Sequence, residues 1–397
     1  MSPVSLAEPQ APAADVERRV AAPARDVVFA FAYATWKTAC ERGMCFSEDR
    51  LVETLLGHPS VRRLLVVETP RSLPIKLVKD RLRPPPPFPA VPGAALHGPT
   101  RLRRSDPRGI GALQRTYGAW DRSVRRAAQR HGLERPALIT THPLVPGFAD
   151  AQWADSLTYY AYDDLAASPP LRPWWPAYEE AYRRTRERGH RVVAVSQAIV
   201  DRIDPRGPHL VVPNGVDPQE WSSPRRAPVW FTALPGPRLL YVGSLDSRVD
   251  VDQLARAARR MPSASIVLVG PLLDPEHFSA LRAERNVHVH GSVAREQVVG
   301  LIGAADACLI PHVRNALTEA MSPLKLYEYL AGGAPVAALD LTPIRDISPR
   351  VVITEELADG IARALVLGRA DDGERGRFAQ ANSWRSRQER IIELALA

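Results

Sequence analysis

Residues 321–338 read MSPLKLYEYLAGGAPVAA, and this stretch decides the fold class. Ser322 is predicted to cap a helix, Pro323 suits the first helical position, and the glycine pair after Ala331 ends the helix. An apolar strand is predicted to follow over 336–338. A helix that passes through glycines directly into a buried strand is the repeating step of an α/β fold.

The same step recurs on both sides of this stretch and predicts an α/β domain over 238–375. Strands are predicted over 238–242, 265–269, 287–289, 307–310 and 351–353, and helices over 251–260, 295–304, 324–330 and 357–366. Strands that alternate with helices at this spacing form βαβ units, which build a parallel sheet. A last helix is predicted over 378–395, within a C-terminal segment of residues 376–397.

A similar series comes earlier and predicts an α/β domain over 25–216, followed by a linker at 217–237. Its strands are predicted over 26–33, 64–68, 137–140, 157–162, 191–195 and 210–212, and its helices over 49–56, 110–131, 178–188 and 197–203. Residues 70–108 are rich in Pro and Arg, and we expect a loop or insertion there rather than any part of a sheet. Residues 1–24 are expected to be a disordered tail. The predicted fold is two Rossmann-like, doubly wound parallel sheets facing a cleft.

The composition excludes several classes of protein. The 397 residues carry 52 Lys and Arg against 44 Asp and Glu, a net charge of +8. The basic residues are spread along the whole chain, so no nucleic-acid partner is expected, whereas phosphorylated ligands and an anionic membrane surface both fit the charge. No apolar run is long enough to span a membrane, and the three cysteines form no metal-binding cluster. We expect a cytoplasmic chain without a metal site.

Lys325 and Glu328 are the most informative charges in the sequence. Lys325 lies in the first turn of its predicted helix, where the helix dipole is already positive, and it precedes Glu328 in the less favourable order for an ion pair. Both costs vanish if an anion binds over the start of the helix, held by free N–H groups and by the ammonium. Glu328 would then accept hydrogen bonds from hydroxyls such as those of a ribose. The alternative is a solvated pair on a surface helix.

Polar residues also follow two predicted strands of the N-terminal domain. Asp163 and Asp164 come after 157–162, and His142 comes after 137–140. A doubly wound sheet places its ligands at the carboxyl ends of its strands, so we expect these side chains to face a ligand, Asp163 more than Asp164. The alternatives are a capping role for the aspartates and a turn role for His142. The sequence contains no GxxxxGK[ST] motif, which excludes a nucleotide-hydrolysing P-loop.

Short motifs accompany these elements in a defined order within residues 137–395. They are YYAYDD at 159–164, VAVS at 193–196, PNGVD at 213–217, YVG at 241–243, LVGP at 268–271, HG at 290–291, ADA at 305–307 and SPLKLYEYLAGGAPV at 322–336. This order resembles the GT-B glycosyltransferases, specifically the retaining nucleotide-sugar enzymes of the family 4 or group 1 kind. Within that group it is most similar to the bacterial teichuronic-acid and exopolysaccharide branch.

The resemblance implies where substrates bind. A nucleotide-sugar donor is implied in the C-terminal domain, with its diphosphate at the start of helix 324–330 and its ribose on Glu328. The implied donor-binding residues are Gly243, Ser244, Arg248, Ser322, Pro323, Leu324, Lys325 and Glu328. The implied acceptor-side residues are His142, Asp163 and Asp164. Asp163, Lys325 and His142 are the residues expected to be catalytic, and the C-terminal helix is expected to cross back to the N-terminal domain.

The resemblance also implies the reaction. The leaving diphosphate takes the acceptor's proton, and neither a metal nor another cofactor is implied. The acceptor is a glycan, a lipid-linked or a small-molecule hydroxyl, and the enzyme is a hexosyltransferase of cell-envelope polysaccharide, cytoplasmic or peripheral at the inner face of the membrane. Ala320 stands at the family's first Glu position, with Glu319 one residue away, and the loop after Gly243 lacks the usual Arg and Lys. A non-catalytic GT-B scaffold that binds a nucleotide-sugar or a partner is therefore an alternative, and a nucleotide-sugar epimerase is another.

Overall fold

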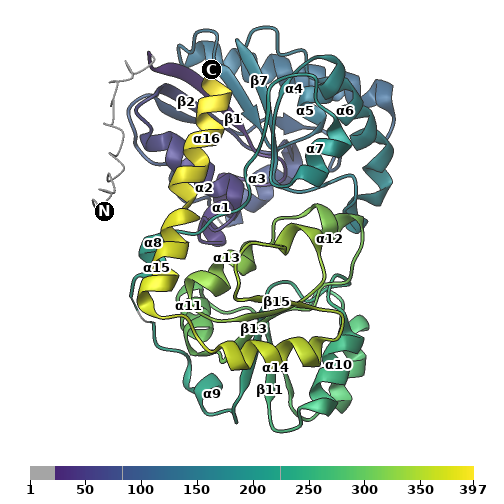
Figure 1. Cartoon of the computed structure of the whole chain (residues 1–397). Helices are drawn as coiled ribbons and strands as arrows, with labels where there is room; N and C mark the ends of the chain where they lie inside the picture. The colour runs from purple at the N-terminus through teal and green to yellow at the C-terminus, as the bar shows by residue number, and fades with distance from the viewer. Residues whose placement is uncertain (1–22, 83, 224) are drawn as a thin grey trace, which may run out of the picture.

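The computed structural model describes residues 23–82, 84–223 and 225–397. The tail expected at residues 1–24 lies outside this part of the chain, apart from its last two residues. Two lobes are visible in Figure 1, each built around its own sheet, with α16 running along the N-terminal lobe. The two sheets confirm the predicted pair of doubly wound domains.

The N-terminal lobe contains a seven-stranded parallel sheet in the order β4-β2-β1-β6-β7-β8-β9. Its strands are β1 (Arg25–Ala30), β2 (Val61–Val67), β4 (Ala94–His97), β6 (Ala137–Thr140), β7 (Ser156–Ala161), β8 (Arg191–Ala194) and β9 (His209–Val211). Its main helices are α1 (Trp36–Glu41), α2 (Ser47–Gly57), α4 (Ile110–Arg130), α5 (Leu144–Phe148), α6 (Trp175–Glu187) and α7 (Gln197–Ile203). Central strands such as β1 and β6 are almost wholly buried, as expected of a parallel sheet covered on both faces.

The Pro- and Arg-rich segment is more ordered than predicted. It contains β3 (Arg71–Ser72), α3 (Leu73–Leu82), β4 and β5 (Thr100–Arg101). The prediction that it contributes nothing to a sheet was wrong, because β4 pairs in parallel with β2. The four residues of β4 contain no proline, and they lie at the edge of the sheet, where a Pro-rich neighbourhood is tolerated.

The C-terminal lobe contains a six-stranded sheet in the order β12-β11-β10-β13-β14-β15. Its strands are β10 (Arg238–Val242), β11 (Ser265–Val269), β12 (Val287–His290), β13 (Ala307–Ile310), β14 (Val336–Leu339) and β15 (Val351–Thr354). Its main helices are α10 (Val251–Arg260), α11 (Arg295–Ala304), α12 (Ala316–Ala320), α13 (Leu324–Ala331) and α14 (Leu357–Leu367). These bounds lie within one residue of the predicted ones, apart from α12, for which no helix was predicted. The segment predicted as a linker holds two short helices, α8 (Pro218–Trp221) and α9 (Val229–Thr232).

The C-terminal end of the chain forms two helices rather than the single one predicted. They are α15 (Asp372–Ala381) and α16 (Trp384–Leu396). The helix breaks at Ser383, whose side chain caps α16 by accepting a hydrogen bond from Ser386 N. Beyond the break, α16 crosses back and contacts α2, β6 and β7, as the resemblance implies (Figure 1).

Candidate active site between the two domains

Two glycines at the ends of β10 and β11 make room for Lys325. Gly243 and Gly270 have φ angles of +147° and +149°, in a region that side chains rarely adopt. A Cβ on Gly243 would lie 2.6 Å from Lys325 Nζ, and one on Gly270 would lie 2.0 Å from the Gly243 carbonyl oxygen. The two loops therefore stack backbone on backbone, and the ammonium lies directly against the first of them.

The Lys325 side chain is fixed by two aromatic neighbours. Its Nζ donates to Tyr241 Oη at 2.8 Å, lies 3.2 Å from His312 Nε2 and sits 4.0 Å from the centre of the Tyr241 ring. Burial, with help from the nearby Arg248 guanidinium, lowers the pKa of Lys325 to about 7. Burial also holds the pKa of His312 well below its usual value, so the imidazole is neutral and accepts from the ammonium. The alternative of a solvated Lys–Glu pair is wrong.

A loop that carries Arg248 closes the site on the side of β10. The Arg248 guanidinium makes two hydrogen bonds to Asp246, at 2.9 and 2.7 Å. The Ser244 carbonyl accepts from Tyr241 Oη at 3.1 Å, so Ser244 contributes its backbone to this arrangement. Because Asp246 balances the charge of Arg248, the loop carries little net charge. The positive charge beside the start of α13 is then the Lys325 ammonium.

The start of α13 differs from the prediction in two respects. The helix begins at Leu324, so Pro323, which is extended, is not its first residue, and Ser322 is not its cap. Ser322 Oγ instead accepts from Asn214 N at 3.0 Å, and the Asn214 amide donates to the Ser322 carbonyl at 2.6 Å. Ser322 therefore ties the two domains together beside the helix start, and the first N–H groups of α13 have no intrahelical partner.

Glu328 is engaged in a buried ion pair. It is 8% exposed, and its Oε1 lies 2.6 Å from Arg295 Nη2. The same guanidinium makes two hydrogen bonds to Glu220, at 2.8 and 2.6 Å. Burial raises the pKa of Cys45 in the N-terminal domain, and the charges of Arg295 and Glu328 also act on this pKa. This group of charges therefore faces the space between the domains.

Asp163 is a predicted acceptor-side residue on which a charge of the C-terminal domain acts. Its carboxylate is close enough to Arg248 for the guanidinium to affect its pKa, although burial dominates and raises that pKa to about 6. Asp163 Oδ1 accepts from Asp164 N at 2.9 Å. Asp164 is occupied otherwise, because it pairs with Arg202 at 2.5 Å and accepts from Ala166 N at 3.1 Å. Asp163 thus faces the donor loop, while Asp164 holds its own loop in place.

His142 is buried within the N-terminal domain. It is 2% exposed, its Nε2 lies 3.0 Å from Tyr117 Oη, and its Nδ1 accepts from Leu144 N at 3.2 Å. Burial lowers its pKa to about 4, so the ring is neutral and both nitrogens are occupied. Among the described residues its partners all belong to this domain, and the structure does not bring it to Lys325.

Comparison with known families identifies the chain. Residues 67–220 match the model of Glycosyltransferase Family 4, and residues 236–367 match the model of Glycosyl transferases group 1. The two matches cover most of both lobes. The chain belongs to the group 1, family 4 glycosyltransferases.

The relatives of this glycosyltransferase are distant. It is 28% identical over 134 residues to TuaH of Bacillus subtilis (strain 168), described as a teichuronic acid biosynthesis glycosyltransferase. That match spans 33% of this chain and 34% of TuaH. Among solved structures, a trehalose-6-phosphate synthase, OtsA, has a TM-score of 0.68 at 10% identity and covers 93% of this chain and 99% of its own. AviGT4, involved in avilamycin A biosynthesis, has a TM-score of 0.54 at 16% identity, over 93% and 96%. These likenesses establish the GT-B fold.

Four residues of the site were not found from the sequence. They are Tyr241, Asp246, Arg295 and His312. Arg295 carries the signal that revealed Lys325, since it also places a positive charge in the first turn of a helix. His312 follows β13 at the carboxyl edge of the sheet and could have been found on that ground.

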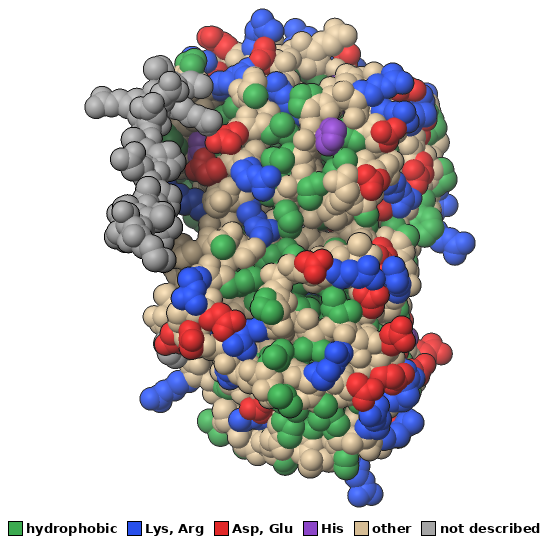
Figure 2. Space-filling view, in the orientation of Figure 1, with side chains coloured by type: hydrophobic (Ala, Val, Ile, Leu, Met, Phe, Trp, Pro, Cys, Tyr) green, Lys and Arg blue, Asp and Glu red, His purple; other side chains and the backbone are tan. Residues whose placement is uncertain are grey.

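Within residues 23–82, 84–223 and 225–397, no group of three or more His, Cys, Asp and Glu side chains could hold a metal ion. None of the helices described is both long and apolar enough to cross a membrane. On the face shown in Figure 2, basic and acidic side chains are interspersed over both lobes.

Proposed function

We propose that the chain transfers a hexose from a nucleoside-diphosphate donor to an acceptor hydroxyl, with retention and without a metal. The observation that carries this proposal is the Lys325 ammonium, held by Tyr241 and His312 where the Gly243 loop meets the start of α13. An ammonium buried beside free helix N–H groups suits a ligand with concentrated negative charge.

In the proposed reaction, negative charge develops on the leaving diphosphate beside Lys325 and the start of α13. The bond between the anomeric carbon and the phosphate oxygen breaks, and the charge on the leaving diphosphate is stabilised by Lys325, Arg248 and the first amides of α13. The acceptor hydroxyl forms the new bond on the same face, and its proton passes to the leaving phosphate. Asp163 orients the acceptor, and Glu328 accepts hydrogen bonds from the ribose hydroxyls.

The acceptor we propose is a glycan or a lipid-linked or small-molecule hydroxyl of cell-envelope polysaccharide, reached at the inner face of a membrane. Support for membrane contact comes from α4, whose outer face exposes several arginines near an exposed apolar residue, Leu102. The exposed arginines of α4 are Arg115, Arg122, Arg125, Arg126 and Arg130. Basic side chains beside an exposed apolar one suit an anionic headgroup layer.

A second candidate function is nucleotide-sugar binding without catalysis. It is favoured by Ala320 in place of an acidic residue and by the ion pair that already occupies Glu328 Oε1. Both candidate functions predict nucleotide binding, but only the first predicts turnover.

Calorimetry with UDP, GDP, dTDP and ADP, each with and without Mg²⁺, tests the proposal first. We expect one nucleotide to bind and to raise the Tm by mass action, without a requirement for Mg²⁺. Lys325→Ala should weaken this binding at least tenfold, and the exposed Arg282→Ala should leave it unchanged. Nucleotide release on addition of acceptor then separates transfer from binding alone. If no nucleotide binds at millimolar concentration, the donor site is misassigned.

A further inference from the structure

The chain passes between its two lobes twice, and the two passages lie against each other. Val216 N donates to the Asn382 carbonyl at 3.0 Å, and Trp384 N donates to the Val216 carbonyl at 2.8 Å. A Cβ on Gly215 would lie 2.8 Å from the Asn382 carbonyl oxygen, so the two backbones are in direct contact. Any change in the angle between the lobes must bend this paired segment.

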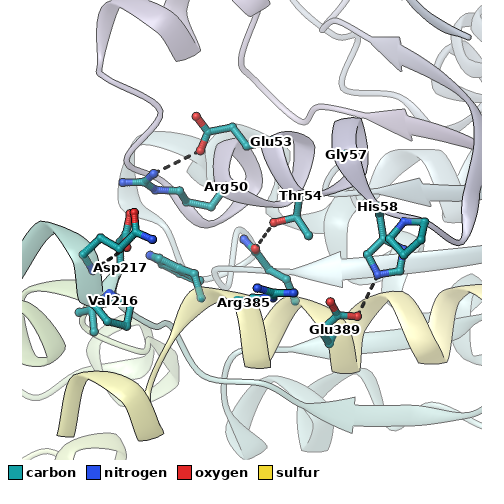
Figure 3. A pocket seen from close by; sticks show the side chains of 14 residues that line it. Arg50, Glu53, Thr54, Gly57, His58, Val216, Asp217, Arg385 and Glu389 are labelled. Atoms are coloured by element: carbon teal, nitrogen blue, oxygen red, sulfur yellow. Dashed lines mark hydrogen bonds and ion pairs between the residues drawn. The ribbon is translucent and has the colours of Figure 1, made fainter. Parts of the chain in front are cut away.

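A cavity of about 420 Å³ adjoins the paired segment. We call it the hinge cavity; its walls are the second half of α2, residues 216–219 and the first turns of α16. Figure 3 shows Thr54 of α2, and His58 just after it, facing Arg385 and Glu389 of α16, with Val216 and Asp217 at one end. Its volume falls in the range of small-molecule pockets, about 300–1,000 Å³. No residue of the candidate active site lines it.

The walls of the hinge cavity are joined by side chains that leave several donors unused. His58 Nε2 lies 2.9 Å from Glu389 Oε2, and Thr54 Oγ1 donates to Gln388 Oε1. Gln388 is 2% exposed, yet its Nε2 has no partner, and neither does the buried Nε of Arg50. Within the described residues, the exposed Arg385 side chain makes no hydrogen bond or ion pair.

Unused donors indicate a ligand that brings acceptor oxygens. A buried amide N–H without a partner is costly, and a free guanidinium beside it suits a carboxylate or phosphate group. The opposite side of the cavity offers acceptors instead, because the carboxyl groups of Glu53 and Asp217 line it. Trp384 adds an apolar surface between these walls. A ring with several hydroxyls and one anionic group satisfies all three features.

We propose that the hinge cavity binds a small anionic sugar, with its charged group on Arg385 and its hydroxyls on Gln388, Glu53 and Asp217. The ligand would touch the N-terminal domain and both passages of the chain at once. Its affinity therefore depends on the angle between the lobes, and it is coupled to nucleotide binding in the cleft. This coupling, unlike the binding itself, rests on the proposed function.

Isothermal calorimetry on the full chain tests the binding. The probes are glucose 6-phosphate, glucuronate, glucose and inorganic phosphate; the first two compare phosphate with carboxylate, and the last two lack the anion or the ring. We expect one of the first two to bind one per chain, at least tenfold tighter than glucose or phosphate. Arg385→Ala should weaken it at least tenfold, Arg385→Lys less, and Arg390→Ala, an exposed arginine of the same helix, not at all.

Two outcomes would overturn the site. One is that no anionic sugar binds better than glucose and inorganic phosphate. The other is binding that survives Arg385→Ala and disappears in Lys325→Ala, which would place the sugar in the cleft.

The coupling is tested by measuring the Kd of the bound nucleotide with and without saturating anionic sugar. We expect a change of at least threefold, and the same factor in the sugar's Kd when the nucleotide saturates. A nucleotide Kd that stays constant overturns the coupling. If no nucleotide binds, the proposed function fails, and the sugar isotherms still decide the hinge cavity.

Discussion

Lys325 shares a small buried space with a phenol and an imidazole, and neither of these contacts carries a negative charge. Burial, together with the nearby Arg248 guanidinium, therefore destabilises the ammonium, and the pKa of Lys325 falls to about 7. A diphosphate would supply the missing negative charge and restore the protonated form. The lowered pKa of Lys325 is thus part of how the site would recognise its donor.

Nucleotide binding should accordingly take up protons above pH 7. At pH 8 the free Lys325 is mostly neutral, so we expect uptake of up to about one proton per nucleotide. Calorimetry in two buffers of different ionisation enthalpy measures this number, and it should vanish in Lys325→Met. Uptake that persists in the variant would assign the proton to the nucleotide or another group.

Lys325 also makes folding stability depend on pH, because its pKa is 10.5 in the unfolded chain and about 7 in the folded protein. Its contribution to the free energy of unfolding therefore rises with pH from 7 upward and is lost as pH falls through 7.

Glu328→Gln should weaken donor affinity, because a hydrogen bond to a charged group is replaced by a neutral one, at a cost of about 0.5–2 kcal/mol. Glu220→Gln is the matched control, since Glu220 binds the same Arg295 guanidinium from the linker side. We expect the control to keep its nucleotide Kd. Equal losses in both variants would show that the effect passes through Arg295 and not through the ribose.

At the scale of elements, the glycine at the end of β10 determines how closely α13 can approach. Gly243→Ala places a methyl group 2.6 Å from Lys325 Nζ and strains a backbone with a φ of +147°. We expect a loss of about 1–3 kcal/mol in stability and a clear loss of nucleotide affinity, measured by denaturant unfolding and calorimetry. Gly303→Ala in α11, where a Cβ meets nothing within 4 Å, should stabilise the protein by up to about 1 kcal/mol and leave nucleotide affinity unchanged. Wild-type nucleotide binding by Gly243→Ala would separate this loop from the donor site.

Regular elements were predictable from the sequence, and their junctions were not. Strands such as β10, β11 and β13 match their predicted bounds because each is a short apolar run between turn residues. Ser322 has the chemistry of a helix cap, but a tertiary hydrogen bond from Asn214 takes its hydroxyl instead. The break at Ser383 was missed because a helical pattern continues across it, whereas the backbone on both sides of Ser383 pairs with Val216. Contacts between domains decide these positions, and local sequence does not contain them.

The side chains of the site divide in the same way: those with a local signal in the sequence were predicted, and those positioned by contacts between elements were not. Lys325 and Glu328 were found because each is unfavourable in its own helix, which is a local signal. The partners that hold them, His312 and Arg295, come from other elements and meet them only in the fold. Asp163 was placed correctly at a strand end, but its proximity to Arg248 depends on how the two domains face each other.

At the scale of the whole molecule, Asp163 of one domain faces the Arg248 loop of the other. We predict that Asp163→Asn binds the nucleotide normally and transfers sugar more slowly, by at least tenfold in kcat/KM. The pKa of Asp163 is about 6, so the carboxylate forms as pH rises through 6, and kcat/KM should fall below this pH. This acid limb should be absent from the variant. Loss of nucleotide binding in Asp163→Asn would mean that the residue belongs to the donor site.

The return of α16 to the N-terminal lobe also governs how the protein is made. Ile391, Ile392 and Ala395 belong to the hydrophobic core that contains β1 and β6. All seven strands of the first sheet are therefore synthesised before part of their apolar cover. We expect that apolar surface to stay uncovered until the ribosome has completed α16, the interval in which a nascent chain is most prone to aggregate.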